Sequence, residues 1–154
     1  PKMLNKAKSQ SRLGHNLDNK KSTVKRSDNF KVSFQYLDTS QKYGSSFKDW
    51  QACGLLSLMM EKIAGYCKKP LLEQCDGDTF TIYGDYPQRG FTLFEYPKNV
   101  PEDANWARMH INGSAVLIGH VVENTFYVVF LDKTHKFYLT KKDREKYFGK
   151  QRER

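Results

Sequence analysis

Residues 106–132, WARMHINGSAVLIGHVVENTFYVVFLD, restrict the fold of this chain more than any other segment. Three apolar runs are separated here by Asn112-Gly113 and Glu123-Asn124. An Asn-Gly pair is a strong signal for a two-residue β-hairpin turn, because both turn residues adopt positive φ. Three strands joined by two short turns form an antiparallel meander, so we predict a β-sheet in this part of the chain.

The predicted turns also set the register of the sheet. With Asn112-Gly113 as a two-residue turn, Trp106, Arg108 and His110 share one face and His120 lies on the other. His120 is then beside Tyr127, provided that Glu123-Asn124 is also a two-residue turn. Both faces of the central strands are apolar, so the sequence leaves open which one carries a helix; the other needs a cover, from the N-terminal segment or a partner. The predicted faces are Leu117, Val121, Phe126 and Phe130 on one side and Val116, Ile118, Val129 and Leu131 on the other.

The segment upstream of the meander predicts further strands and one long helix. Residues 31–37, KVSFQYL, alternate as a strand does, and residues 79–84 and 91–96 are shorter strand candidates before a loop at 97–105. Residues 46–67 are predicted as a single helix that begins with a capping box between Ser46 and Asp49. Its apolar face has steps of three and four residues and consists of Phe47, Trp50, Cys53, Leu56, Met60, Ile63 and Cys67. These elements predict an α+β fold with the order β-α-β-β-β, in which one long helix packs on an antiparallel sheet of about four to five strands.

Length and charge divide the chain into one domain and two basic ends. A chain of 154 residues with 38% hydrophobic composition suits one globular domain. Residues 1–29 contain eight Lys/Arg and two acidic residues, and residues 141–154 contain seven and three; subtracting these from the totals of 26 and 17 leaves 11 basic and 12 acidic residues between them. We therefore predict a basic flexible N-terminal segment (1–29), a nearly neutral α+β domain (30–142) and a basic C-terminal tail (143–154).

Basic ends of this kind bind polyanions through counterion release, or remain solvated and disordered. No apolar run approaches the roughly 20 residues that cross a bilayer, and the first residues lack the apolar stretch of a signal peptide. We expect a cytoplasmic protein with no membrane partner.

The sequence predicts neither a metal site nor a cofactor. Cys53, Cys67 and Cys75 are odd in number and lack paired C-x-x-C spacing, so they indicate no disulfide framework and no zinc site. Glycine-rich phosphate loops, G-x-S-x-G and H-E-x-x-H are absent from the sequence. The chemistry has to come from other side chains.

Three of the four histidines, His110, His120 and His135, fall in the predicted meander together with basic and aromatic side chains. Histidine suits proton transfer near neutral pH, and Arg or Lys suits a phosphate. The candidate catalytic residues are therefore His135, His110, Arg108 and His120, and the candidate phosphate-binding or substrate-binding residues are Lys133, Lys136, Tyr138 and Arg89. Structural alternatives stay open: His120 as a core residue, Arg89 as a solvated surface residue, Tyr138 as core packing and residues 135–138 as an ordinary strand end.

The segment WARMHINGSAVLIGHVVENTFYVVFLDKTHKFYLTKK resembles the C-terminal sheet of toxins of the RelE/ParE superfamily. In that family a strand with Arg and His precedes a hydrophobic central strand and a closing segment of His, Lys and Tyr. The resemblance covers roughly residues 31–142. The near-neutral body and the longer 70–100 segment depart from the family pattern.

The resemblance implies a RelE-like fold, RNA as a partner in the form of ribosome-associated mRNA, and an antitoxin protein that neutralises the toxin. It allows two activities, mRNA cleavage and gyrase inhibition. Metal-independent cleavage uses the ribose 2′-OH as nucleophile and needs proton transfer and stabilisation of charge on phosphorus. We therefore predict a small endoribonuclease toxin; the alternatives are a non-catalytic nucleic-acid-binding or gyrase-inhibiting module and an interaction protein whose apolar sheet docks a partner.

Overall fold

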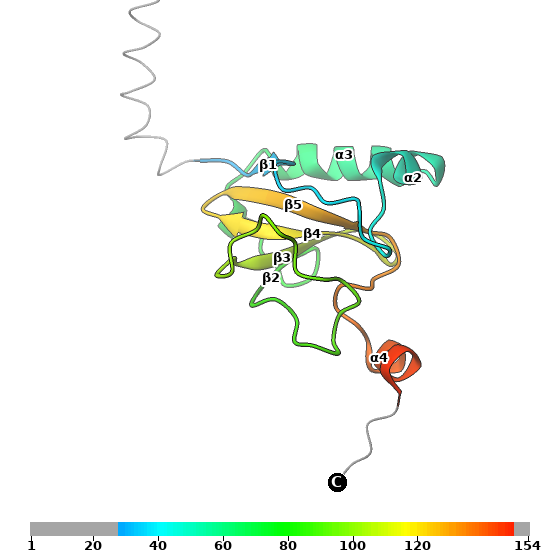
Figure 1. Cartoon of the computed structure of the whole chain (residues 1–154). Helices are drawn as coiled ribbons and strands as arrows, with labels where there is room; N and C mark the ends of the chain where they lie inside the picture. The colour runs from blue at the N-terminus through cyan, green and yellow to red at the C-terminus, as the bar shows by residue number, and fades with distance from the viewer. Residues whose placement is uncertain (1–27, 150–154) are drawn as a thin grey trace, which may run out of the picture.

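The structure of the protein is a computed structural model, and it is described for residues 28–149. The predicted N-terminal segment lies outside these residues apart from Asp28 and Asn29, as do residues 150–154 of the predicted tail. The fold is α+β, with a five-stranded sheet in the order β1-β5-β4-β3-β2 and helices on one side of it and at the C-terminal end (Figure 1). The strands are β1 (Lys31–Ser33), β2 (Phe80–Gly84), β3 (Trp106–Asn112), β4 (Ala115–Val122) and β5 (Thr125–Asp132). The helices are α2 (Phe47–Ala52), α3 (Leu55–Tyr66), the 3₁₀ helix η1 (Leu71–Glu73) and α4 (Lys141–Phe148).

The sheet is mixed, whereas the sequence predicted a wholly antiparallel one. β2, β3, β4 and β5 pair antiparallel, which confirms the predicted meander. β1 pairs in parallel with β5. The two strands are far apart in the sequence, so no local pattern predicts this pairing. Residues 91–96 form no strand, although the N–H of Leu93 donates to Lys136 O (3.0 Å) and the N–H of Leu139 donates to Phe91 O (2.8 Å).

The predicted single helix is divided in two at Gly54. The capping box is present, with Ser46 Oγ accepting from the N–H of Asp49 (3.1 Å) and Asp49 Oδ2 accepting from the N–H of Ser46 (2.9 Å). Gly54 adopts φ +77°, a left-handed conformation that ends α2 and that glycine adopts at low cost. The break rotates the buried face: α3 buries Leu55, Met59 and Ile63, while Met60, predicted in the core, is 50% exposed.

Two β-bulges change the predicted sides of the sheet residues. In the first hairpin Asn112 pairs with Ala115, so the turn residues are Gly113 and Ser114, and Ile111 is an extra residue in β3. Trp106 then pairs with His120, which places His120 on the same face as Trp106, Arg108 and His110 instead of the opposite one. The second turn is as predicted, because Val122 pairs with Thr125 across Glu123-Asn124 and His120 pairs with Tyr127.

The second bulge lies between β4 and β5. Ile118 pairs with Phe130 and Gly119 with Val128, so Val129 has no direct partner. An extra residue reverses the alternation beyond it, and Phe130 and Leu131 therefore lie on the faces opposite to those predicted. A Cβ atom on Gly119 would lie 2.0 Å from Tyr127 O, so the close approach of the strands requires glycine here.

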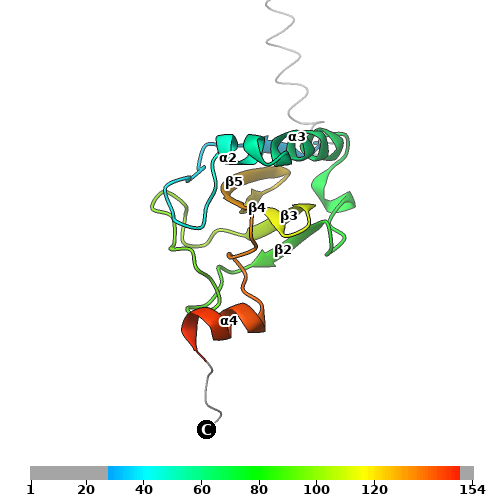
Figure 2. The same ribbon diagram turned by 90° about the vertical axis from the view of Figure 1, so that its right-hand side faces the viewer.

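Each face of the sheet has its own core. α2 and α3 cover the face of Leu117 and Phe126 (Figures 1 and 2). The loop between β2 and β3 and the segment between β5 and α4 cover the other face, where Phe94 and Phe137 pack on Phe130. The cover that the sequence required thus comes from the chain itself. Each fully buried aromatic or large aliphatic side chain contributes on the order of 1.5–3 kcal/mol to folding.

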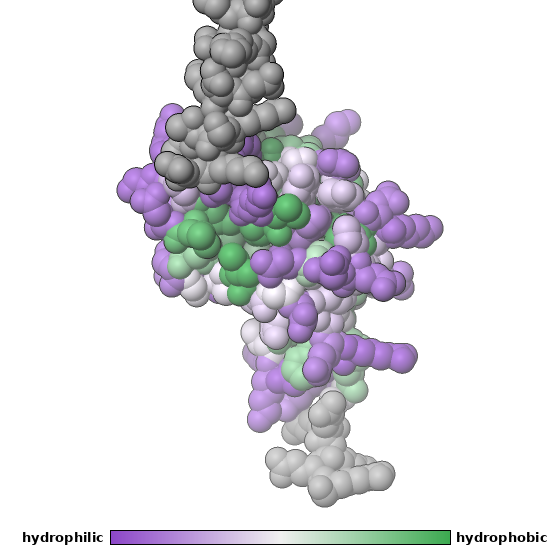
Figure 3. Space-filling model, turned by 90° about the vertical axis from the view of Figure 1, so that its left-hand side faces the viewer, coloured by the Kyte–Doolittle hydropathy of each residue, from purple (hydrophilic) through white to green (hydrophobic). Residues whose placement is uncertain are grey.

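One surface region remains apolar. Figure 3 shows hydrophobic side chains gathered on the side of the molecule where η1 and the β4–β5 turn lie. The N–H of Leu71 donates to Asn124 Oδ1 (2.9 Å), which holds η1 against that turn. Leu72 and Val122 are 83% and 53% exposed.

None of the helices within residues 28–149 has both the length and the apolar character needed to span a bilayer.

Candidate functional site

Tyr83, Arg108 and Tyr138 form the tyrosine–arginine cluster on the sheet face opposite α2 and α3. Arg108 projects from β3 and Tyr83 from the adjacent β2, while Tyr138 lies in the segment that follows β5. The rings of Tyr83 and Tyr138 are stacked, with centroids 5.0 Å apart and an interplanar angle of 26°. The guanidinium carbon of Arg108 lies 5.9 Å from the Tyr83 centroid. Tyr138 is 41% exposed, so one ring of the stack is accessible from solvent.

Arg108 has no carboxylate partner within the described residues. The ion pairs found in residues 28–149 are Lys31–Asp28 and Lys136–Asp143, and neither includes Arg108. Its Nε is buried without a hydrogen-bond partner, and the residue as a whole is half-buried. A half-buried guanidinium that lacks an acidic neighbour is a strong binding group for an anion, and phosphate fits its planar fork.

A buried carboxylate holds the turn that carries His135. Asp132 is fully buried at the end of β5, and its two oxygens accept the N–H groups of Lys136 (2.9 Å) and Phe137 (2.8 Å). Burial raises the pKa of Asp132, and these two N–H groups and the nearby His135 and Lys136 oppose the rise. His135 has φ +59°, a conformation that side chains rarely adopt, and its Nδ1 is buried without a hydrogen-bond partner. The hydrogen bonds of Asp132 thus fix His135 in a turn that is strained on its own.

Electrostatic effects connect Asp132 to the tyrosine–arginine cluster. Burial raises the pKa of Tyr83 to about 12; Arg108 lowers it, and the neighbouring Tyr138 and Asp132 raise it further. Tyr83 is therefore a neutral phenol at physiological pH. The structure thus brings Arg108 and Tyr138 together with Tyr83, and Asp132 interacts electrostatically with both Tyr83 and His135.

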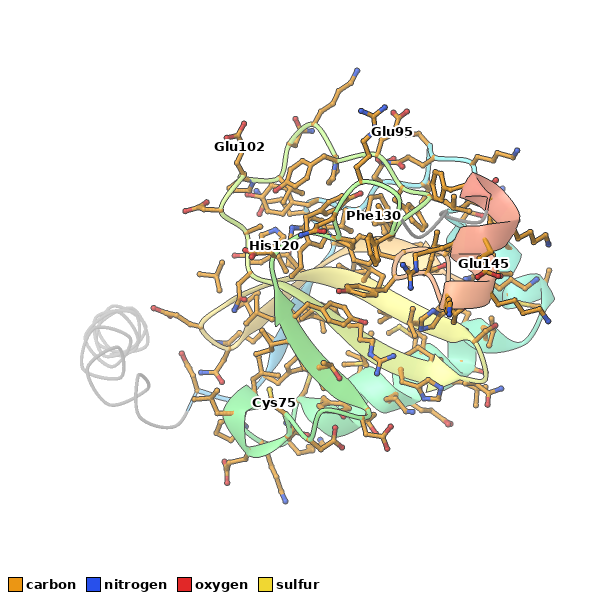
Figure 4. All side chains as sticks on the ribbon, turned by 90° about the horizontal axis from the view of Figure 1, so that it is seen from below. Cys75, Glu95, Glu102, His120, Phe130 and Glu145 are labelled. Carbon is orange, nitrogen blue, oxygen red and sulfur yellow. The ribbon has the colours of Figure 1, made fainter. Side chains whose placement is uncertain are left out.

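His110 and His120 lie on the same sheet face as Arg108, but on opposite sides of Arg108 along the strands. His120 pairs with Trp106, and His110 is four residues further along β3, about 13 Å at roughly 3.3 Å per residue. The Nε2 of His110 is hydrogen-bonded to Gly113 O (2.9 Å). His120 is 3% exposed beneath the loop that carries Glu95 and Glu102 (Figure 4).

His120 is enclosed by aromatic rings. Its centroid lies 5.1 Å from that of Tyr127, with nearly parallel planes, and 5.2 Å from that of Tyr36. Burial lowers the pKa of His120, and its Nε2 has no hydrogen-bond partner. Its surroundings correspond to the core alternative that the sequence left open.

The three predicted cationic phosphate ligands lie in different places. Lys136 Nζ is paired with Asp143 Oδ2 (3.2 Å), so its charge is already partly neutralised. Lys133 lines a pocket with Lys42 and Asp49 at the start of α2. Arg89 lines another pocket, beside α4.

Sequence reasoning missed Tyr83 and Asp132. The strand pattern at 79–84 placed Tyr83 on one face but gave no reason to connect it with Tyr138, which is 55 residues away. Asp132 carried a signal, since it is the single acid that ends the most apolar strand of the chain.

Comparison of the chain with protein-family models, curated protein sequences and solved structures finds no match. The function therefore has to be argued from the site itself. Within residues 28–149, no three His, Cys, Asp or Glu side chains are grouped so that they would hold a metal ion.

Proposed function

We propose that this protein is a small metal-independent endoribonuclease with a RelE-like arrangement of its sheet, acting on mRNA and neutralised by an antitoxin. The observation that carries the proposal is the half-buried Arg108, which has no carboxylate partner in the described residues and lies beside the stacked Tyr83 and Tyr138. Proteins bind single-stranded RNA by stacking bases on aromatic rings while Arg binds phosphate. The exposed Tyr138 supplies the ring and Arg108 the cation.

The proposed reaction is attack of a ribose 2′-oxygen on the adjacent phosphorus. The bond between this oxygen and phosphorus forms as the bond to the 5′ oxygen breaks, which leaves a 2′,3′-cyclic phosphate and a 5′-hydroxyl end. His135 accepts the 2′-OH proton, and the Tyr138 phenol donates a proton to the departing 5′ oxygen and recovers it from the His135 imidazolium through solvent. Arg108 stabilises the charge that develops on the phosphoryl oxygens, an effect worth several kcal/mol when donors are preorganised.

Asp132 supports this assignment of His135. A carboxylate near an imidazole stabilises the imidazolium that forms when the histidine accepts a proton. Asp132 also holds the His135 turn through its two hydrogen bonds to the backbone. His110 and His120 have no place in this scheme, because one is bonded to Gly113 and the other is enclosed in the core.

The test maps RNA 5′ ends in a translation extract after addition of the wild type, His135→Asn or Arg108→Gln. Asparagine suits position 135 because it tolerates positive φ better than alanine does. We expect new 5′-hydroxyl ends with the wild type, a loss of at least 100-fold in cleavage rate with His135→Asn, and weaker RNA binding with Arg108→Gln. His110→Asn is the matched comparison and should retain cleavage.

The alternative is a nucleic-acid-binding or gyrase-inhibiting module that cleaves nothing. The observation in its favour is that His110 is hydrogen-bonded to Gly113 O and His120 is enclosed by aromatic rings, which leaves one of the three histidines in residues 28–149, His135, for proton transfer. A folded wild type that binds RNA or inhibits gyrase but produces no new RNA ends would exclude the nuclease and support this alternative.

A further inference from the structure

A second basic site lies beside α4, apart from the tyrosine–arginine cluster. A pocket of about 500 Å³ opens between the turn at Arg89-Gly90 and α4. Its charged lining residues are Arg89, Lys141, Arg144 and Glu145, three cations and one acid. The charged residues of the pocket therefore carry a net positive charge. The two ion pairs found in residues 28–149 involve none of them.

Arg144 is the preorganised member of this pocket, which we call the Arg144 pocket. Its guanidinium carbon lies 4.4 Å from the centroid of Phe91, the shortest of the cation–π contacts in residues 28–149. Its Nε is buried and has no hydrogen-bond partner there. The Phe91 ring restricts the guanidinium, so little entropy is lost when the free N–H groups bind a ligand.

Glu145 lines the same pocket without neutralising it. Neither Arg89, Lys141 nor Arg144 forms an ion pair within 4.0 Å among the described residues. Asp143, the other acid of α4, is paired with Lys136. The three cations are thus available to an anion, and two planar guanidinium groups with one ammonium group match the oxygens of a phosphate.

The Arg144 pocket adjoins the tyrosine–arginine cluster through a backbone connection. The N–H of Leu139 donates to Phe91 O (2.8 Å), so residues 136–139 run beside the segment that carries Phe91. Tyr138 precedes Leu139 directly, and Phe91 contacts Arg144. Figure 4 shows α4, with Glu145, beside the sheet face that bears Phe130 and His120.

We propose that the Arg144 pocket binds a phosphate group of a single-stranded nucleic acid whose bases stack at Tyr138. This proposal rests on the proposed RNA binding and adds a second phosphate contact outside the reacting centre. The phosphoryl oxygens that Arg144 binds belong either to an internal phosphodiester or to a 5′-terminal phosphate. Both present the same chemistry to the pocket.

The first experiment measures the affinity of 3′-labelled RNA oligonucleotides, with and without a 5′-phosphate, by fluorescence anisotropy. Arg144→Gln should weaken binding about fivefold at 0.1 M salt and make the plot of log K against log salt shallower by about 0.7, the effect of one phosphate contact to a single strand. Lys142→Gln removes the same charge from an exposed position of α4 outside the pocket and should change both quantities less. A loss with both oligonucleotides assigns an internal phosphodiester; a loss with the 5′-phosphorylated one alone assigns a terminal phosphate.

The second measurement keeps this proposal separate from the proposed function. Inorganic phosphate is titrated into the wild type, Arg89→Gln and Lys142→Gln while the Nε–Hε resonance of Arg144 is followed by NMR. We expect a saturable shift in the wild type and Lys142→Gln and a weaker one in Arg89→Gln. RNA affinity that is unchanged in Arg108→Gln would contradict the proposed function. If Arg144→Gln still weakens RNA binding and phosphate still shifts the Arg144 resonance, phosphate binding in the Arg144 pocket remains supported.

Two results overturn the proposal. One is an equal loss of affinity in Arg144→Gln and Lys142→Gln, which would show a general effect of charge. The other is the absence of a phosphate-dependent shift at Arg144. Arg144→Lys, which keeps the charge without the planar fork, guards against a folding defect: it should retain the helical circular dichroism signal and the salt slope while losing affinity.

Discussion

Asp132 and His120 are the two buried polar side chains of the described residues, and they differ in their hydrogen bonding. Asp132 is fully buried, yet each of its oxygens accepts a backbone N–H, so the cost of its burial is compensated in part. His120 is also buried, but its Nε2 has no hydrogen-bond partner, and aromatic rings surround it. A buried polar atom without a partner costs about 1–3 kcal/mol. We therefore expect His120 to lower the stability of the fold and to make that stability sensitive to acid.

Replacing His120 with Phe should reduce the acid sensitivity of the fold. Burial lowers the pKa of His120 in the folded state below its usual value near 6.5, so the unfolded state binds the proton more strongly. Above about pH 6.5 His120 is neutral in both the folded and the unfolded state, and the free energy of unfolding has its full value. As the pH falls from there towards the lowered pKa of folded His120, the unfolded state takes up the proton and the free energy of unfolding decreases. His120→Phe removes this loss and should raise the free energy of unfolding by about 1 kcal/mol at pH 7.5.

Urea unfolding at pH 7.5 and pH 5.5 provides the measurement. Tyr127→Phe keeps the ring beside His120 and serves as the control, because it should leave the acid sensitivity as in the wild type. If His120→Phe becomes unstable in acid to the same extent as the wild type, His120 is not the source of the effect.

Single positions also determine the lengths and sides of the structural elements. Ser46 and Asp49 start α2, and Gly54 separates it from α3. Thr140 caps α4, with its Oγ1 accepting the N–H of Asp143 (3.2 Å). In the sheet, one extra residue at Ile111 and another at Val129 decide which side chains face α3 and which face the tyrosine–arginine cluster. The elements themselves follow from local signals, but their orientation depends on these few positions.

Ser46→Ala should lower the free energy of unfolding by about 1 kcal/mol. The substitution leaves the N–H of Asp49 without its acceptor and removes half of the capping box. Chemical denaturation at neutral pH measures the loss. Ser57→Ala makes the same change at an exposed position inside α3 and should cause no loss, because alanine is a better helix former than serine. Equal stabilities of the two variants would show that the cap contributes nothing.

At the scale of the whole molecule, the excess of basic over acidic residues and the two arginine sites lie in different parts of the chain. Residues 1–27 contain eight of the 26 Lys and Arg residues. The tyrosine–arginine cluster and the Arg144 pocket lie within residues 28–149, where Arg108 and Arg144 are the cations in contact with Tyr83 and Phe91. We therefore expect the basic N-terminal residues to add affinity for any polyanion, and the two arginine sites to contribute contacts of defined geometry.

Deleting residues 1–27 should make the salt dependence of RNA binding shallower while preserving the effect of Arg108→Gln. Each lost phosphate contact reduces the slope by about 0.7 for a single strand. The measurement compares affinities at several salt concentrations for the full chain and the shortened chain, with and without Arg108→Gln. If the deletion abolishes binding and Arg108→Gln has no effect in the full chain, the basic end alone binds RNA.

Much of the fold could be predicted because its signals are local. The alternation of apolar residues and the turn pairs predicted β3, β4 and β5, and the Ser46–Asp49 capping box marked the start of α2. The strand at 91–96 was predicted wrongly, because this segment bonds to residues 136–139 through only two backbone contacts. For the site, the sequence identified Arg108, His135 and Tyr138 as candidates, and their catalytic and binding roles stay predictions.

The sequence by itself determined the α+β composition, the order of most elements and the residue types available for phosphate chemistry, since periodicity, turn preferences and side-chain chemistry are local properties. Only the tertiary structure decided the parallel pairing of β1 with β5, the side on which His120 lies, and the association of Tyr83 with Tyr138. The physical reason is that one bulged residue reverses the alternation of every residue beyond it, and a contact between distant segments depends on that outcome.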